Sequence, residues 1–135
     1  MPKFTIETTY RMPHYRHTTY EAPTAEEACR LAIEDDNWSG ELRDFECCGP
    51  TYVTGIWKGD SSAYEGEDIA VPSHFDEAIQ RKADHFPELL DQLAFVAQPM
   101  GVSKVDYQRW LAKAMAAVAK ARAIIEERRD PDEQS

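Results

Sequence analysis

"SKVDYQRWLAKAMAAVAKARAIIEERR" (residues 103–129) contains the longest helical pattern in the chain. Ser103, three residues before Asp106, predicts a capped helix start. A helix that continues to near Arg129 would be roughly 40 Å long. Its apolar stripe consists of Trp110, Leu111, Met115, Val118 and Ile125, with seven alanines around it. Because this length exceeds what a small sheet needs for cover, we expect the last turns to overhang the domain or to meet a partner.

The segment before this helix predicts a second helix, and the two together predict a C-terminal helical hairpin. Pro72–Ser73 followed by Asp76 is typical of a helix start. Apolar residues then recur at helical spacings: Phe75, Ile79, Phe86, Leu90 and Leu93. Pro87 must kink or split this helix, because proline lacks an N–H and clashes with the preceding turn.

The N-terminal half carries strand patterns around one short helix. Alternating or β-branched residues predict strands over residues 3–10, 15–22, 43–48 and 51–59. The first two strands are expected to pair as an antiparallel hairpin. Thr24 followed by Glu27 predicts a capping box at the start of the helix between the second and third strands.

These patterns together predict one α+β domain over residues 1–130. We expect a ββαββ antiparallel sheet with one helix across a face, followed by the C-terminal helical hairpin with its long last helix. The segments are the sheet with its helix (1–58), a loop rich in glycine and acidic residues (59–72) and the helical part (73–129). Residues 131–135 are expected to form a disordered tail.

The charge of the chain is strongly negative and unevenly distributed. The formal net charge is −10 over 135 residues, with −6 in residues 61–102 and +4 in residues 103–129. An acidic body disfavours direct nucleic-acid binding, which needs clustered Lys and Arg, and suits a protein partner with a basic surface. The contrast between the two segments favours packing of the basic helix against the acidic segment, within one chain or between two.

Neither a membrane span nor an export signal is expected. The sequence has no run of about 18 apolar residues, and its first ten residues (MPKFTIETTY) lack the apolar stretch of a signal peptide. Its three cysteines, two of them adjacent, do not form a disulfide framework and suit a reducing compartment. We therefore expect a cytoplasmic protein.

The sequence lacks the motifs of known catalytic and cofactor sites. It has no CxxC pair, no phosphate-binding GK[ST], no calcium loop and no G-x-S-x-G. We therefore expect no catalytic residue, no metal and no cofactor. Cys29 is expected in the core, and one of Cys47 and Cys48 is expected to be buried. Asp84 beside His85 could form a catalytic acid–base pair. Adjacent charged residues on a helix more often lie on its solvated face, so we expect these two to be exposed to solvent.

A group of rings and arginines in residues 10–20 is the first candidate binding site. The residues expected to contact a partner there are Arg11, His14, Tyr15, Arg16 and His17. The spacing of three between His14 and His17 places them on opposite faces of a strand. No third ligand follows at a motif spacing, so a metal site is disfavoured. The alternative is an exposed hairpin tip whose basic groups offset nearby acids.

The loop 59–72 is the second candidate binding site. Its glycines permit unusual backbone angles, and long loops in compact domains are often functional. The residues expected to contact a partner in or beside it are Trp57, Asp60, Tyr64, Glu65, Glu67 and Asp68. The alternatives are a plain connector and a small-molecule or enzymatic site near the loop.

Three runs of sequence resemble small uncharacterised proteins encoded on bacterial plasmids and other mobile elements. They are "TYRMPHYRHTTYEAPTAEEACRLAIEDDNW", "TYVTGIWKGDSSAY" and "QRKADHF". The resemblance covers most of residues 4–95 and implies an accessory role, with no assigned activity. Small acidic proteins of such elements include inhibitors of host defence, such as anti-CRISPR proteins. The resemblance therefore implies that this protein inhibits a host defence system.

The sequence therefore favours a non-enzymatic, acidic accessory protein that binds another protein. The expected partner has a basic surface, for example a host defence or nucleic-acid-handling complex. The first alternative is a homodimer assembled through the C-terminal helix. Its expected interface consists of Trp110, Ala114, Ala117 and Ala121. The second alternative is the small-molecule or enzymatic site near the 59–72 loop.

Overall fold

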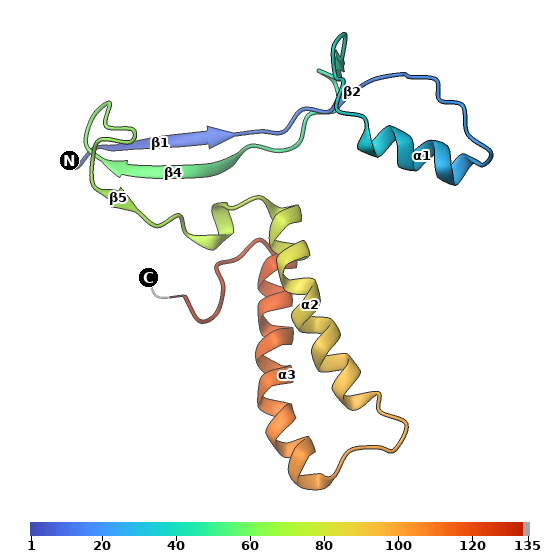
Figure 1. Ribbon diagram of the computed structural model, residues 1–135. Helices are drawn as coiled ribbons and strands as arrows, with labels where there is room; N and C mark the ends of the chain where they lie inside the picture. The colour runs from blue at the N-terminus through green and yellow to red at the C-terminus, as the bar shows by residue number, and fades with distance from the viewer. Residues whose placement is uncertain (134–135) are drawn as a thin grey trace. The chain divides into compact units, whose positions relative to one another are not determined.

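The computed structural model describes residues 1–133, and the chain divides into two compact units. The larger unit comprises residues 1–9 and 51–133, and the smaller unit comprises residues 10–50. Residues 1–133 contain two small antiparallel sheets and three α-helices, the last two of which form a C-terminal pair (Figure 1). The expected α+β class is confirmed, whereas the exact ββαββ order is not.

The predicted segment 1–58 is divided between the two units. Residues 1–9 and 51–58 belong to the larger unit, and residues 10–50 form the smaller unit. A single domain over residues 1–130 stays a prediction. None of the helices in residues 1–133 combines the length and the apolarity that a membrane span requires.

The sheet of the larger unit has the strand order β1-β4-β5. Its strands are β1 (Phe4–Thr9), β4 (Tyr52–Lys58) and β5 (Asp68–Ile69), all paired antiparallel. The predicted pairing of the first strand with the next segment along the chain is therefore wrong, since β1 pairs with β4. A bulge after Glu7 leaves Thr54 as the extra residue of β4.

Gly55 makes room for the aromatic packing of this sheet. A Cβ at this position would come within 2.3 Å of the Trp57 ring, because side chains two residues apart share one face of a strand. The ring of Tyr64 lies 4.7 Å from the Trp57 ring. Only 6% of Trp57 is exposed, so this candidate contact residue belongs to the packing of the sheet rather than to its surface.

The helical part consists of a short 3₁₀ helix, η1 (Ser73–Phe75), and the two long helices α2 (Ala78–Val96) and α3 (Lys104–Ile125). α2 and α3 pack against each other as the predicted hairpin (Figure 1). α2 begins later than predicted, because the backbone is extended at Asp76, directly after η1. Pro87 lies inside α2, and the helix is not split there.

The predicted starts of α1 and α3 are confirmed by their caps. The Thr24 Oγ1 atom accepts the backbone N–H of Glu27, and the Ser103 Oγ atom accepts that of Asp106. Each bond satisfies one of the N–H groups that a helix start leaves unpaired.

α3 ends in a Schellman motif about one turn before the predicted end near Arg129. The N–H of Arg128 donates to the carbonyl of Ala123, and the N–H of Glu127 donates to that of Ile124. The motif requires a left-handed residue between the helix and the following chain. Glu127 takes this conformation, with φ +56°, although glycine adopts it at lower cost.

The smaller unit consists of β2 (His14–Tyr15), α1 (Ala25–Glu34) and β3 (Leu42–Arg43). β2 and β3 form an antiparallel pair of two residues each, so the strands predicted over residues 15–22 and 43–48 are almost entirely absent. In the second of these segments, the Asp44 carboxylate accepts the N–H groups of the two residues that follow Phe45, which turns the chain.

The expected core positions of the cysteines are wrong. No residue of α1 is buried, and Cys29 is exposed on it. Cys47 and Cys48 are exposed as well, because the segment around them turns instead of extending as a strand.

We predict that Glu127→Gly stabilises the protein by about 1 kcal/mol, because glycine removes the cost of the left-handed conformation. Urea unfolding followed by circular dichroism measures the change. Glu126→Gly is the matched control: Glu126 has φ −86°, so glycine there gains nothing and only adds chain entropy. Equal destabilisation by both substitutions would contradict the role of Glu127.

Candidate functional site

Arg16, a member of the expected binding tip, closes the C-terminal end of α1. Its Nη2 atom donates to the carbonyls of Ala32 (2.8 Å) and Asp35 (2.7 Å), and its Nη1 atom donates to that of Asn37. A helix end leaves such carbonyls unpaired, and its dipole favours a cation there. The guanidinium also lies 4.0 Å from the centre of the Trp38 ring.

Only 13% of the Arg16 side chain is exposed, so it serves the fold of the smaller unit. The other members of the tip lie at the surface: Arg11, His14, Tyr15 and His17. The rings of Tyr15 and His17 are 5.5 Å apart, as their alternate positions predict. A cavity of about 370 Å³ lies beside them, and its lining residues include His14, Tyr15, Tyr20, Ile33 and Trp38.

The β4–β5 loop (residues 59–67) is held in a defined conformation by β1. The hydroxyl of Thr5 donates to the carbonyl of Gly59 (2.9 Å) and accepts the N–H of Ser62 (3.0 Å). Two residues of the loop are left-handed without being glycine, Ser61 with φ +51° and Tyr64 with φ +64°. This conformation costs free energy, so the contacts with β1 and with Trp57 are what maintain it.

The acidic side chains of this loop and of β5 point into solvent. Asp60 lies 3.6 Å from the Lys3 ammonium and Glu67 lies 3.0 Å from that of Lys58, yet their side chains remain 73% and 67% exposed. Ion pairs at such exposure contribute little. The carboxylates of Glu65 and Asp68, also exposed, have no ion-pair partner in residues 1–133.

The bulge in β4 links the sheet to Tyr64. The Glu7 carboxylate accepts hydrogen bonds from the extra residue, Thr54 (2.6 Å), and from the Tyr64 hydroxyl. These two bonds, that of Thr54 first, hold the pKa of Glu7 below its usual value. The Tyr64 bond to Glu7 in turn raises the pKa of the hydroxyl.

The seam between α2 and α3 is unusually polar. Nε2 of His85, a buried residue, donates to the carbonyl of Ala117 at 2.8 Å. Nε1 of Trp110 donates to the carbonyl of Gln92 at 2.9 Å, and its ring stacks on that of Phe95. The expected solvated position of His85 is therefore wrong, and Asp84 does not pair with it but accepts from a glutamine of its own helix.

The four residues of the expected dimer interface lie in this seam or beside it. Trp110 and Ala117 make the contacts just described, while Ala114 and Ala121 are half-buried on the same face of α3. Their small side chains allow α2 to approach closely within one chain. The interface predicted for a homodimer is therefore occupied inside the chain.

One face of the hairpin is charged. The residues that line a cavity of about 510 Å³ there include Asp84, Glu88, Lys113 and Lys120, with alanines of α3 and residues of the C-terminal segment. A second cavity of about 290 Å³ is lined by residues that include Asp91, Arg109 and Lys113. Acidic residues of α2 thus lie beside basic residues of α3, as the charge distribution of the sequence predicts.

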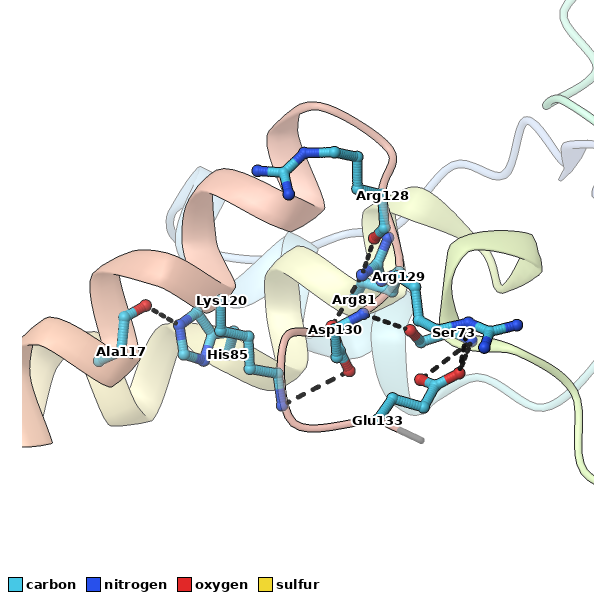
Figure 2. Close-up of polar contacts among 9 residues, drawn as sticks. All are labelled: Ser73, Arg81, His85, Ala117, Lys120, Arg128, Arg129, Asp130 and Glu133. Carbon is cyan, nitrogen blue, oxygen red and sulfur yellow. Dashed lines mark hydrogen bonds and ion pairs between the residues drawn. The ribbon is translucent and has the colours of Figure 1, made fainter. Parts of the chain in front are cut away.

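A group of polar contacts, the C-terminal clasp, ties the segment after α3 to the start of the helical part (Figure 2). Nη2 of Arg81 donates to the carbonyl of Arg128 and to the Asp130 carboxylate, both at 2.8 Å. The N–H of Asp130 donates to the Ser73 hydroxyl, and the N–H of Ser73 donates to the Glu133 carboxylate. Glu133 lies in the expected disordered tail 131–135, of which residues 134–135 lie outside the described residues.

Residues 1–133 contain no group of three or more His, Cys, Asp or Glu side chains placed to hold a metal ion. None of the three cavities described above is lined by a residue of the β4–β5 loop. The feature of this loop is therefore an exposed acidic surface on a fixed backbone.

We predict that Arg16→Lys destabilises α1, because an ammonium cannot reach three carbonyls and stack on Trp38 at once. The expected cost is about 1–3 kcal/mol, measured as faster amide hydrogen exchange in residues 28–35. Arg30→Lys is the control, since Arg30 forms only exposed pairs with Glu26 and Glu27 of the same helix. Unchanged exchange in the Arg16 variant would show that the C-terminal end of α1 does not need the guanidinium.

We predict that Glu7 makes the stability of the larger unit depend on acidic pH. Because the folded-state pKa of Glu7 is lowered, its contribution is present above the unfolded pKa and is lost as the pH falls through the folded pKa. Glu7→Gln should therefore flatten the pH dependence of the melting temperature below about pH 5. Glu65→Gln, which removes one acid from the same region, is the control. An identical pH profile for wild type and Glu7→Gln would refute the role of these bonds.

Compared with protein-family models, with curated proteins and with solved structures, the chain matches none. The resemblance to proteins of plasmids and mobile elements therefore stays a prediction, and function is argued from the surfaces of the chain itself.

Proposed function

We propose that this protein is a non-enzymatic accessory protein that binds a partner with a basic surface through its β4–β5 loop and β5. The observation that carries the proposal is the loop itself. Its backbone is fixed by contacts with Thr5, Trp57 and Glu7. Its acidic side chains, with Asp68 of β5, are exposed.

A fixed loop is suited to binding because less conformational entropy is lost when the partner docks. The left-handed backbone at Ser61 and Tyr64 supports this argument, since a strained conformation persists only where its surroundings maintain it. The aromatic ring of Tyr64 stands among the acids and is itself exposed, and tyrosine is common in protein interfaces.

The charge of the whole chain supports a basic partner. A net charge of −10 repels nucleic acid and attracts a basic groove over a range of about 10 Å at moderate ionic strength. Nucleic-acid-handling proteins present such grooves. We therefore propose a host defence or nucleic-acid-handling complex as the partner, with inhibition by occupation of its groove, in a cytoplasmic setting.

The acids are not expected to contribute equally. Asp60 and Glu67 must give up the ammonium groups of Lys3 and Lys58 when a partner binds, whereas Glu65 and Asp68 have none to give up. The latter two carboxylates should therefore carry more of the affinity.

We predict that Glu65→Lys with Asp68→Lys weakens partner binding by at least about tenfold, because close charge pairs across interfaces each contribute more than about 1.4 kcal/mol. The partner is first captured with the tagged protein from an extract of its source cells and identified by mass spectrometry. Binding of the purified partner is then measured by calorimetry at two salt concentrations, where the wild-type affinity should fall with salt.

The matched control is Glu88→Lys with Asp91→Lys, which makes the same change in net charge on the charged face of the hairpin. It should bind like the wild type. Binding that survives the loop variant unchanged would rule out the loop as the contact, and equal losses in both variants would show a general effect of net charge.

A further inference from the structure

α2 has its polar and apolar residues in inverted positions. Arg81 faces the segment after α3, His85 faces α3, and both are buried. The apolar residues at helical spacing, by contrast, are exposed: Ile79, Phe86, Leu90 and Leu93. A helix in water normally turns its apolar stripe toward the core, so a surface that covers this stripe is missing from the hairpin.

α3 continues the same apolar surface. Beyond the first turn of α3, its exposed large apolar residues are Leu111, Met115, Val118 and Ile125. His85 lies opposite Ala117, and Gln92 lies opposite Trp110, across the antiparallel pair. Counting about 100° per residue around each helix from these contacts places both exposed stripes on one side of the hairpin. The charged residues that line the two cavities fall on the other side.

This surface, the apolar hairpin face, is defined by the eight residues just named on α2 and α3. Between 37% and 72% of each is exposed, which adds up to on the order of 800 Å² of apolar surface, about what one partner contributes to a stable interface. The largest apolar patch on an ordinary monomer is about 300–600 Å².

The charges on this face are few and all basic. In line with its helical stripes lie Lys82 of α2 and Lys104 and Arg122 of α3, and neither stripe contains an acid. Two copies of a chain with a net charge of −10 can therefore meet here without placing acidic side chains against each other.

We propose that a second copy of this chain docks on the apolar hairpin face, so that two hairpins form a four-helix arrangement. A two-fold interface buries the same patch on both copies. Pairs of hairpins packed by their apolar faces are the basis of four-helix bundles. The proposed interface is distinct from that of Trp110, Ala114, Ala117 and Ala121, which is filled within the chain.

The test is the molar mass of the full chain, measured by light scattering and sedimentation between about 1 and 200 μM, a range that covers micromolar dissociation constants. We expect twice the monomer mass of 15.4 kDa. Leu90→Glu should weaken self-association by about 100-fold or more, because each of the two copies then buries a new negative charge in the interface. Met115→Glu tests the same face from α3, and circular dichroism confirms that each variant keeps its helices.

The matched control is Ala116→Glu, which adds the same charge to α3 on the charged face and should dimerise like the wild type. A wild type that stays monomeric at about 200 μM overturns the proposal. This holds even if a different protein is then found to bind the apolar hairpin face. Wild-type association in Leu90→Glu and Met115→Glu, or an equal loss in Ala116→Glu, overturns it as well. This result is independent of the proposed function, because the isolated chain is measured and the β4–β5 loop is unchanged.

Discussion

The helical hairpin depends on how one buried cation, Arg81, is neutralised. Only 8% of its side chain is exposed, and a buried charge without a partner is strongly destabilising. The partners come from the segment after α3, through the carbonyl of Arg128 and the carboxylate of Asp130. The left-handed turn at Glu127 aims the chain back toward α2. The clasp thus fixes the end of α3 against the beginning of α2. It thereby sets which residues of the two helices lie opposite each other, such as His85 and Ala117.

The polar seam also explains the apolar surface outside it. Because Arg81 and His85 take inward positions of α2, Phe86, Leu90 and Leu93 are left on the outside. Sequence periodicity predicts which residues share a helix face, but not which face packs. The apolar stripe of α2 was therefore predictable, whereas its exposure was not: it depends on contacts with residues up to 49 positions away.

Several other predictions differ in the same way: those that depend on residues close in the sequence are confirmed, and those that depend on residues far apart are not. The caps at Thr24 and Ser103 could be predicted because each bond spans three residues. The pairing of β1 with β4 could not, because its residues lie more than 40 positions apart. Arg16 looked like a surface group because the carbonyls that it binds lie at the end of a helix 16 and more residues later. In the candidate loop, the acids could be read from the sequence, but their fixed backbone and the burial of Trp57 could not.

The register of β1 and β4 shows that the smaller unit is inserted between two paired strands of the larger unit. Thr9 and Tyr52 are direct partners in the ladder, so the residues between them leave and re-enter the sheet at neighbouring points. Residues 10–50 are thus an insertion at the end of an antiparallel strand pair, where a two-residue turn would otherwise suffice. The larger unit could be rebuilt as a contiguous hairpin followed by helices, and a different module could be grafted at the same junction.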